Sequence, residues 1–137
     1  VPRVKWGGIM FSDLLKLVEP LPSATHVLFH SLGETTSAPS GQRHYIECFK
    51  LADLLDPEQR MLLALDIDGR PLPAERGAPL RVTAPFKLAY KSIKFVHRME
   101  FVDEMKEGWW TIANPIYDVE AEVPTWMLED ARRSKRE

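Results

Sequence analysis

The sequence predicts a single α+β domain, in which short strands form a mixed or barrel-like β-sheet core and helices are few and short. Three observations lead to this fold class. The chain has 137 residues, enough for one hydrophobic core and short for two. Apolar residues make up 45% of it and charged residues 28%, as in ordinary globular proteins. Its β-rich segments follow one another without the regular alternation with helices that marks a parallel sheet.

The first predicted element is a short amphipathic helix at residues 11–19. Ser12 suits the N-cap position, Asp13 suits the positive start of a helix, and Pro20 ends the element. Four apolar residues of this segment predict its buried stripe: Leu14, Leu15, Leu17 and Val18. The helix should therefore pack one face against the core.

The middle of the chain predicts short strands joined by turns. Four apolar, β-forming segments are expected to be strands: 25–32, 44–49, 61–67 and 80–84. A polar loop at 33–42 separates the first two strands, and residues 50–55 suit one helical turn. Asp68-Gly69 indicates a tight turn after the third strand.

The clearest strand pattern covers residues 92–102, where side chains alternate between two faces. The predicted core face carries Ile93, Phe95, His97, Met99 and Phe101. The other face carries Lys94, Val96, Arg98, Glu100 and Val102. Beyond this strand, residues 108–126 are expected to run extended over the surface, and residues 124–133 suit a last helix.

Charge is distributed unevenly along a chain whose formal net charge is only −2. The segment from Arg76 to Met99 contains no Asp or Glu, so all 20 acidic residues lie elsewhere. Its basic residues are Arg76, Arg81, Lys87, Lys91, Lys94 and Arg98. A cationic segment in an otherwise acidic protein is the pattern of an anion site, whereas the overall charge gives no indication of nucleic-acid binding.

The most suggestive part of this segment surrounds Gly77. Glycine permits a sharp turn or the close approach of a ligand to the backbone. Arg76 and Arg81 bracket the turn, and guanidinium groups match phosphate oxygens. Ser92 and Lys94 follow on the strand face that does not point to the core. The cluster suits a phosphate or a polar heterocycle, but on charge alone a solvated basic surface around a turn glycine is the favoured explanation.

Motifs of this region resemble the sulfite oxidase-like molybdopterin-binding family. The order GRPLPAERGAPLR at 69–81, then Pro85, then YKSIKF at 90–95, carries the resemblance. Trp6-Gly7-Gly8 and Phe29-His30-Ser31 agree with it. The tail with Gly108-Trp109-Trp110 is nearer the branch that contains the catalytic subunit of the bacterial protein-methionine-sulfoxide reductase.

The resemblance implies the sulfite oxidase molybdopterin-binding fold and Mo-molybdopterin as cofactor. The residues that it assigns to the pterin and its phosphate are Ser31, Arg76, Arg81, Ser92, Ile93 and Lys94. Arg76 departs from the family, in which His or Asn is usual at that position. The implied activity is oxygen-atom transfer on a small-molecule or sulfur-containing substrate, and a redox partner is compatible with it.

In the family a cysteine thiolate that ligates molybdenum lies upstream of the Trp-Gly-Gly segment. We therefore expect residues 1–137 to be one molybdopterin-binding domain truncated at its N-terminal side. Such a chain would not coordinate molybdenum normally by itself, and the enzyme activity is expected of the longer protein. The alternative function is a non-catalytic binding or scaffold domain of the same shape.

Other candidate ligands carry weaker patterns. Cys48, the single cysteine, is expected to be a buried structural residue, and no metal ligand is predicted. His26 and His30 share one strand face, yet no third ligand has metal-motif spacing. No apolar segment is long enough for a membrane helix. A soluble protein of the bacterial cytoplasm or periplasm fits these observations, and the choice between the two compartments stays open.

Overall fold

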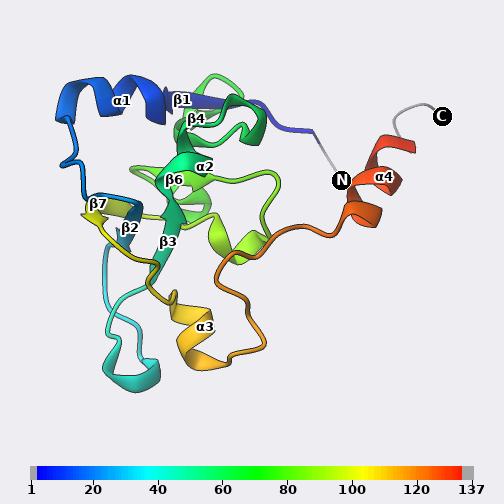
Figure 1. Ribbon diagram of the computed structural model, residues 1–137. Coiled ribbons are helices and arrows are strands. Elements are labelled where there is room, and N and C mark those ends of the chain that lie inside the picture. The colour runs from blue at the N-terminus through cyan, green and yellow to red at the C-terminus, as the bar shows by residue number, and fades with distance from the viewer. Residues whose placement is uncertain (1–2, 134–137) are drawn as a thin grey trace.

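The computed structural model describes residues 3–133. Within this range the strands form two open antiparallel sheets, and no closed barrel is present (Figure 1). The four α-helices are short: α1 (Phe11–Val18), α2 (Leu51–Leu55), α3 (Trp109–Ala113) and α4 (Thr125–Arg133). The α+β class with few short helices is confirmed, and the barrel-like closure is replaced by two separate sheets.

The first sheet is built around β4 (Leu62–Ile67). This strand pairs with β1 (Trp6–Met10), β5 (Arg70–Pro71) and β6 (Arg81–Thr83), all antiparallel. β1 was not predicted, because Gly7-Gly8 has little β-propensity. The structure explains these glycines, since a Cβ on Gly8 would lie 2.1 Å from the carbonyl oxygen of Leu63.

The second sheet has β2 (His26–Ser31) in the centre, between β3 (Ile46–Lys50) and β7 (Val96–Val102). Both faces of β2 are covered. Val27 and Phe29 enter the main core, whereas Leu28 joins a smaller cluster with Ile46 and Cys48. Because side chains alternate along a strand, successive apolar residues of β2 enter opposite packed layers.

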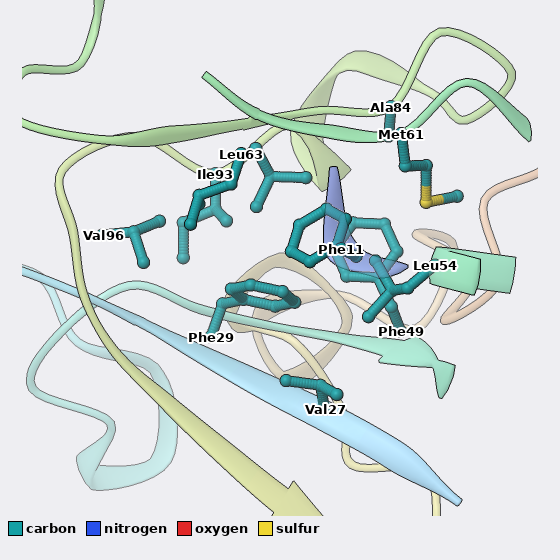
Figure 2. Packing of buried hydrophobic residues seen from close by; sticks show 11 residues of the cluster. Phe11, Val27, Phe29, Phe49, Leu54, Met61, Leu63, Ala84, Ile93 and Val96 are labelled. Atoms are coloured by element: carbon teal, nitrogen blue, oxygen red, sulfur yellow. The ribbon is translucent and has the colours of Figure 1, made fainter. Parts of the chain in front are cut away.

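Aromatic rings hold the main core together between the two sheets (Figure 2). Phe29 contacts Phe11 edge to face, with ring centroids 5.7 Å apart, and Phe49 in the same way at 5.6 Å. Burying each such ring contributes about 1.5–3 kcal/mol relative to leaving it exposed. Phe11 is the first residue of α1, so the N-terminal end of this helix packs against the core.

Helix α1 differs from the sequence prediction in its cap and its buried face. Met10 occupies the N-cap position without a side-chain hydrogen bond, so Ser12 lies inside the helix. Leu17 is 82% exposed and Val18 is half exposed, contrary to the predicted stripe. The helix follows β1 directly, and this tight connection turns its first residues, rather than its last, toward the core.

The strand predicted at 92–102 begins only at Val96. Phe95 has a φ of 56°, and the pairing register with β2 shifts between His30 and Ser31. This irregularity reverses the predicted alternation for the next two residues. Val96 is buried at 2% exposure and His97 is exposed, whereas the prediction placed them the other way.

The segment predicted as extended, 108–126, contains the helix α3. The prediction relied on the prolines and tryptophans of this segment. The helix itself was hard to predict, because only Thr111 of α3 is buried and no clear apolar periodicity marks it. α3 lies at the opposite end of the molecule from α1 and β1 (Figure 1). The last predicted helix, 124–133, is present as α4.

Candidate functional site

The turn at Gly77 brings together the basic residues singled out in the sequence. A 3-10 helix, Ala74–Arg76, ends at Gly77, which has a φ of 109°. A Cβ at Gly77 would lie 2.9 Å from Cβ of Lys94 and 3.2 Å from Cβ of Arg81. Only glycine therefore fits where the turn packs between these two side chains.

Arg81 lies on β6 and reaches across the base of this turn. Its Nη1 donates to the Arg76 carbonyl at 3.1 Å, and its Nη2 donates to the Ser92 carbonyl at 3.2 Å. Its Nε makes a long bond of 3.5 Å to the carbonyl of Val82. Burial, followed by the charge of Arg76, lowers the pKa of Arg81, but a guanidinium stays protonated at neutral pH. The guanidinium also lies over the Trp6 ring, 4.9 Å from its centroid. Of its five N–H groups, two make no hydrogen bond within residues 3–133.

Lys94 approaches the same turn from the other side. Its Nζ donates to the Glu75 carbonyl at 3.0 Å, and the residue is exposed. The Lys94 backbone carbonyl accepts a hydrogen bond of 2.9 Å from the hydroxyl of Ser31. Ser31 on β2 and Lys94 are thereby fixed beside each other, although 63 residues separate them.

Ser92 and Ile93 complete the edge between these groups. The Ser92 hydroxyl accepts a hydrogen bond of 3.2 Å from the backbone N–H of Ala84. Ile93 is buried in the main core, and its carbonyl accepts from the N–H of Val82 at 2.9 Å. The segment 92–94 is thus anchored to β6 at its beginning and to β2 at its end.

Two hollows meet at Ser92. The first has a volume of about 400 Å³, and its lining includes Ser31, Tyr45, Tyr90, Ser92, Ile93 and Lys94. The second has a volume of about 350 Å³, and its lining includes Trp6, Arg60, Arg81 and Ser92. Four of the six predicted cofactor-binding residues therefore line one cavity, and Arg81 lines its neighbour. Arg76 lines neither of these two hollows and contributes its backbone carbonyl to Arg81.

The cationic segment of the sequence is not free of acids in space. Lys87 contacts Asp53, Glu120 and Glu122, and Lys91 contacts Glu47. Arg98 pairs with Glu100 at 3.0 Å. Three of the six predicted cations are consequently paired with acids. The partners of Lys87 and Lys91 come from distant parts of the chain, whereas Glu100 lies beside Arg98 on β7.

Sequence reasoning missed the aromatic wall of the first cavity. Tyr45 donates its hydroxyl to the Tyr90 carbonyl at 2.7 Å and stacks on Trp109 at 6.1 Å between ring centroids. The Trp109 indole N–H contacts the hydroxyl of Thr35 at 3.4 Å. Burial raises the pKa of Tyr45, so its phenol stays protonated. The available signal was that Tyr45 shares a strand face with buried Phe49.

The candidate metal ligands Cys48, His26 and His30 do not line either of the two hollows. Cys48 has 0% exposure, and burial raises the pKa of its thiol, which makes it a structural residue rather than a ready thiolate ligand. His30 Nδ1 lies 2.8 Å from Nε2 of His44, and burial lowers the pKa of His30. Neither histidine belongs to a cluster of three or more candidate ligand atoms within the described residues.

One cluster of three carboxylates is present in the described part of the chain: Asp53, Glu120 and Glu122. The ammonium group of Lys87 lies among them, 2.8 Å from Glu122 and 3.1 Å from Asp53. Its side chain is 2% exposed. Lysine therefore supplies the positive charge that a cation would otherwise bring to these acids.

The fold and the Gly77 turn agree with the comparison to known families. Residues 1–110 match the family described as the oxidoreductase molybdopterin binding domain. The chain belongs to this family and is a molybdopterin-binding oxidoreductase domain.

Similar proteins include catalytic subunits of protein-methionine-sulfoxide reductase from bacteria. The one from Gluconobacter oxydans is 36% identical over 119 residues, which cover 82% of this chain and 38% of that relative. The one from Pseudomonas syringae pv. tomato is 35% identical over 145 residues, covering 95% of this chain and 42% of the relative. This chain thus spans well under half the length of these relatives.

A solved structure supports the fold assignment. The sulfane dehydrogenase SoxCD from Paracoccus pantotrophus aligns with a TM-score of 0.59 and 20% identity. The alignment covers 74% of this chain and 23% of that chain. None of the helices in residues 3–133 has the length and hydrophobicity needed to cross a bilayer.

Proposed function

We propose that this chain forms the cofactor-holding part of a molybdenum-dependent oxidoreductase that transfers an oxygen atom on a sulfur-containing substrate. The observation that carries the proposal is the convergence of Arg81 and Lys94 on the Gly77 turn, next to a cavity edged by Ser31 and Ser92. In this proposal Mo-molybdopterin is held by Ser31, Arg76, Arg81, Ser92, Ile93 and Lys94.

The residues present fit an anionic, phosphorylated pterin. The N–H groups of Arg81 that make no hydrogen bond, together with the exposed ammonium of Lys94, supply charged donors for phosphate oxygens. The hydroxyl groups of Ser31 and Ser92 suit the polar ring of a pterin. A cavity of about 400 Å³ lies within the usual size of small-molecule sites. Glu34, an exposed residue, is the acidic group in its lining.

When bound, the cofactor would supply the redox and oxygen-exchange chemistry, and the protein would supply binding, orientation and electrostatics. The names of the relatives point to a sulfoxide in a protein methionine as the substrate. Reduction of a sulfoxide to a thioether consumes two electrons and two protons and releases water. The proposal therefore includes a redox partner that delivers electrons.

Arg81→Ala tests the assignment of the basic cluster. The variant, wild type and the matched control Arg70→Ala are expressed in a bacterium that makes molybdopterin, and pterin is quantified by fluorescence after oxidative release. Arg70 is exposed on β5 and serves as an arginine outside both hollows. Loss of charged hydrogen bonds to a phosphate predicts a decrease in pterin content of about tenfold or more for Arg81→Ala. Arg70→Ala should keep the wild-type content.

Two results would count against the proposal. Equal pterin content in Arg81→Ala and wild type would remove Arg81 from the site. A folded wild-type protein that acquires no pterin would favour the non-catalytic scaffold function instead.

A further inference from the structure

Lys91 is a buried lysine directly before the Ser92–Lys94 edge of the cavity. Its side chain is 2% exposed, and its Nζ lies 3.2 Å from the Glu47 carboxylate. The same nitrogen donates to the carbonyl of Val119 at 2.7 Å and to the carbonyl of Cys48. It also lies 4.5 Å from the centre of the Phe49 ring. All three ammonium hydrogens thus have partners, and these partners come from distant parts of the sequence.

Glu47, the partner of Lys91 in this ion pair, is buried to the same extent as Lys91. Its side chain is 2% exposed and faces the core side of β3, where Phe29 is its neighbour across the sheet. The Tyr45 hydroxyl oxygen lies 3.4 Å from this carboxylate, while its proton is donated to the closer Tyr90 carbonyl. Gly108, just before α3, covers it so closely that a Cβ there would lie 2.5 Å from the carboxylate oxygen. The ion pair therefore sits where β3, α3 and the segment around Val119 meet.

Such a pair is a costly way to fill a core. Removing two charges from water costs more than their attraction returns, and apolar residues of similar volume often serve stability equally well or better. Methionine is an unbranched apolar side chain only slightly shorter than lysine, and it would pack against Phe49 without that cost. Stability alone does not account for Lys91, whereas its three directed hydrogen bonds do specify a position.

The position that Lys91 specifies is that of the cavity edge. Lys91 ends the 3-10 helix Ala89–Lys91, and its own carbonyl accepts the N–H of Ile93 at 2.8 Å. The N–H of Ser92 bonds back to the Ala89 carbonyl at 3.1 Å. Tyr45 holds the middle of the same turn through the Tyr90 carbonyl. A displacement of this turn would move the backbone of residues 92–94 directly.

We propose that Lys91 is a positioning residue for the cofactor, whose ammonium group holds the Ala89–Lys91 turn and thereby the Ser92–Lys94 edge of the cavity. This inference rests on the proposed function, in which Ser92, Ile93 and Lys94 contact the pterin. Burial lowers the pKa of Lys91 and Glu47 opposes that shift. The carbonyls of Cys48 and Val119 give the ammonium its direction.

Lys87 provides a matched control four residues earlier. Its side chain is also 2% exposed and lies among carboxylates. Its partners Asp53, Glu120 and Glu122 attach the segment 120–122 to α2, and none of them lies in the cavity lining. Replacing Lys87 therefore removes a buried cation of the same kind without releasing the cavity edge.

The test compares wild type, Lys91→Met, the charge-balanced Glu47→Gln/Lys91→Met variant and Lys87→Met. The double variant avoids leaving an unpaired buried carboxylate, so it keeps the test valid if the single variant folds poorly. Each is produced in a molybdopterin-making bacterium, and the folded monomer or oligomer is isolated by size exclusion. Two quantities are measured: pterin content per folded chain, and hydrogen exchange of the backbone amides at 92–96, with β4 as the internal reference.

We expect both Lys91 variants to lose pterin by about tenfold or more, because displacement of the Ser92–Lys94 edge would break a charged hydrogen bond from Lys94 to the cofactor phosphate. The amides at 92–96 should exchange faster in these variants, while those of β4 keep their wild-type rates. Lys87→Met should retain its pterin even where its melting temperature falls. This combination separates positioning from general stability.

Wild-type pterin content in the double variant would overturn the inference, and so would an equal loss in Lys87→Met. Unchanged exchange at 92–96 together with lost pterin would also overturn it, because the edge would not have moved. A wild-type protein without pterin refutes the proposed function itself, and that outcome is distinguished by the wild-type measurement alone.

Discussion

The buried carboxyl of Glu47 makes the stability of the protein depend on pH. Burial raises its pKa from the ordinary value of 4.5 to about 7, and the attraction of Lys91 opposes this shift without cancelling it. The folded protein therefore holds this proton more tightly than the unfolded chain does. The stability contributed is fully present below pH 4.5 and is lost as the pH rises through about 7.

The size of the effect follows from the two pKa values. At about 1.4 kcal/mol per pH unit, the difference between 4.5 and about 7 corresponds to roughly 3 kcal/mol in the free energy of unfolding. Glu47→Gln removes the titration and keeps the shape of the side chain. The difference in unfolding free energy between wild type and Glu47→Gln should therefore move by roughly 3 kcal/mol against wild type between pH 4.5 and pH 8.

The assay is urea unfolding followed by tryptophan fluorescence at several pH values. Subtracting the Glu47→Gln curve removes other titrations, including that of His30. The lowered pKa of His30 acts with the opposite sign, because its contribution is present at high pH and is lost on acidification. A difference curve that is flat, or that favours wild type as the pH rises, would refute the reasoning about Glu47.

Two further predictions concern stability and metal content. Gly8→Ala should destabilise the protein by about 1–3 kcal/mol, because the new Cβ meets the Leu63 backbone at 2.1 Å. Gly33→Ala should cost about 1–2 kcal/mol from backbone strain alone, because Gly33 has a φ of 80° and nothing lies within 4 Å of the new Cβ. Urea unfolding measures both losses, and a larger loss of stability in Gly33→Ala than in Gly8→Ala would contradict the packing argument. Cys48→Ser should lower stability by about 1–3 kcal/mol, because it buries a hydroxyl in a site that offered the thiol no strong hydrogen bond. In the longer protein that carries the family's molybdenum ligand, the same change should leave the molybdenum content, measured by mass spectrometry, unchanged. Loss of metal from a folded Cys48→Ser variant would contradict the structural role of this thiol.

The sequence was informative where local chemistry decides the structure. The strands at 25–32, 44–49 and 61–67 follow from runs of apolar β-forming residues, and the Gly77 turn follows from glycine between basic residues. The resemblance to the family, shown by the match over residues 1–110, carried the functional class. The assignment of individual cofactor contacts remains a prediction.

Features that depend on distant contacts could not be predicted in the same way. The positive φ of Phe95 and the register shift beside it reverse the faces of Val96 and His97. Both depend on how β7 pairs with the end of β2. The partners of Lys87 and Lys91 lie up to 44 residues away in the sequence, so the segment seemed more cationic than it is. A glutamate on the core face of a strand, as at Glu47, was the one local sign of a buried ion pair.

Lys87 and its carboxylate partners Asp53, Glu120 and Glu122 determine how residues 120–122 are attached to α2. Many proteins tie an acidic loop down with calcium, and such loops loosen when the ion is removed by a chelator. Here the counterion is the side chain of Lys87, two residues before the Ala89–Lys91 turn that borders the cavity. The attachment of residues 120–122 is therefore insensitive to the supply of divalent ions, because the positive charge belongs to Lys87 of the same chain.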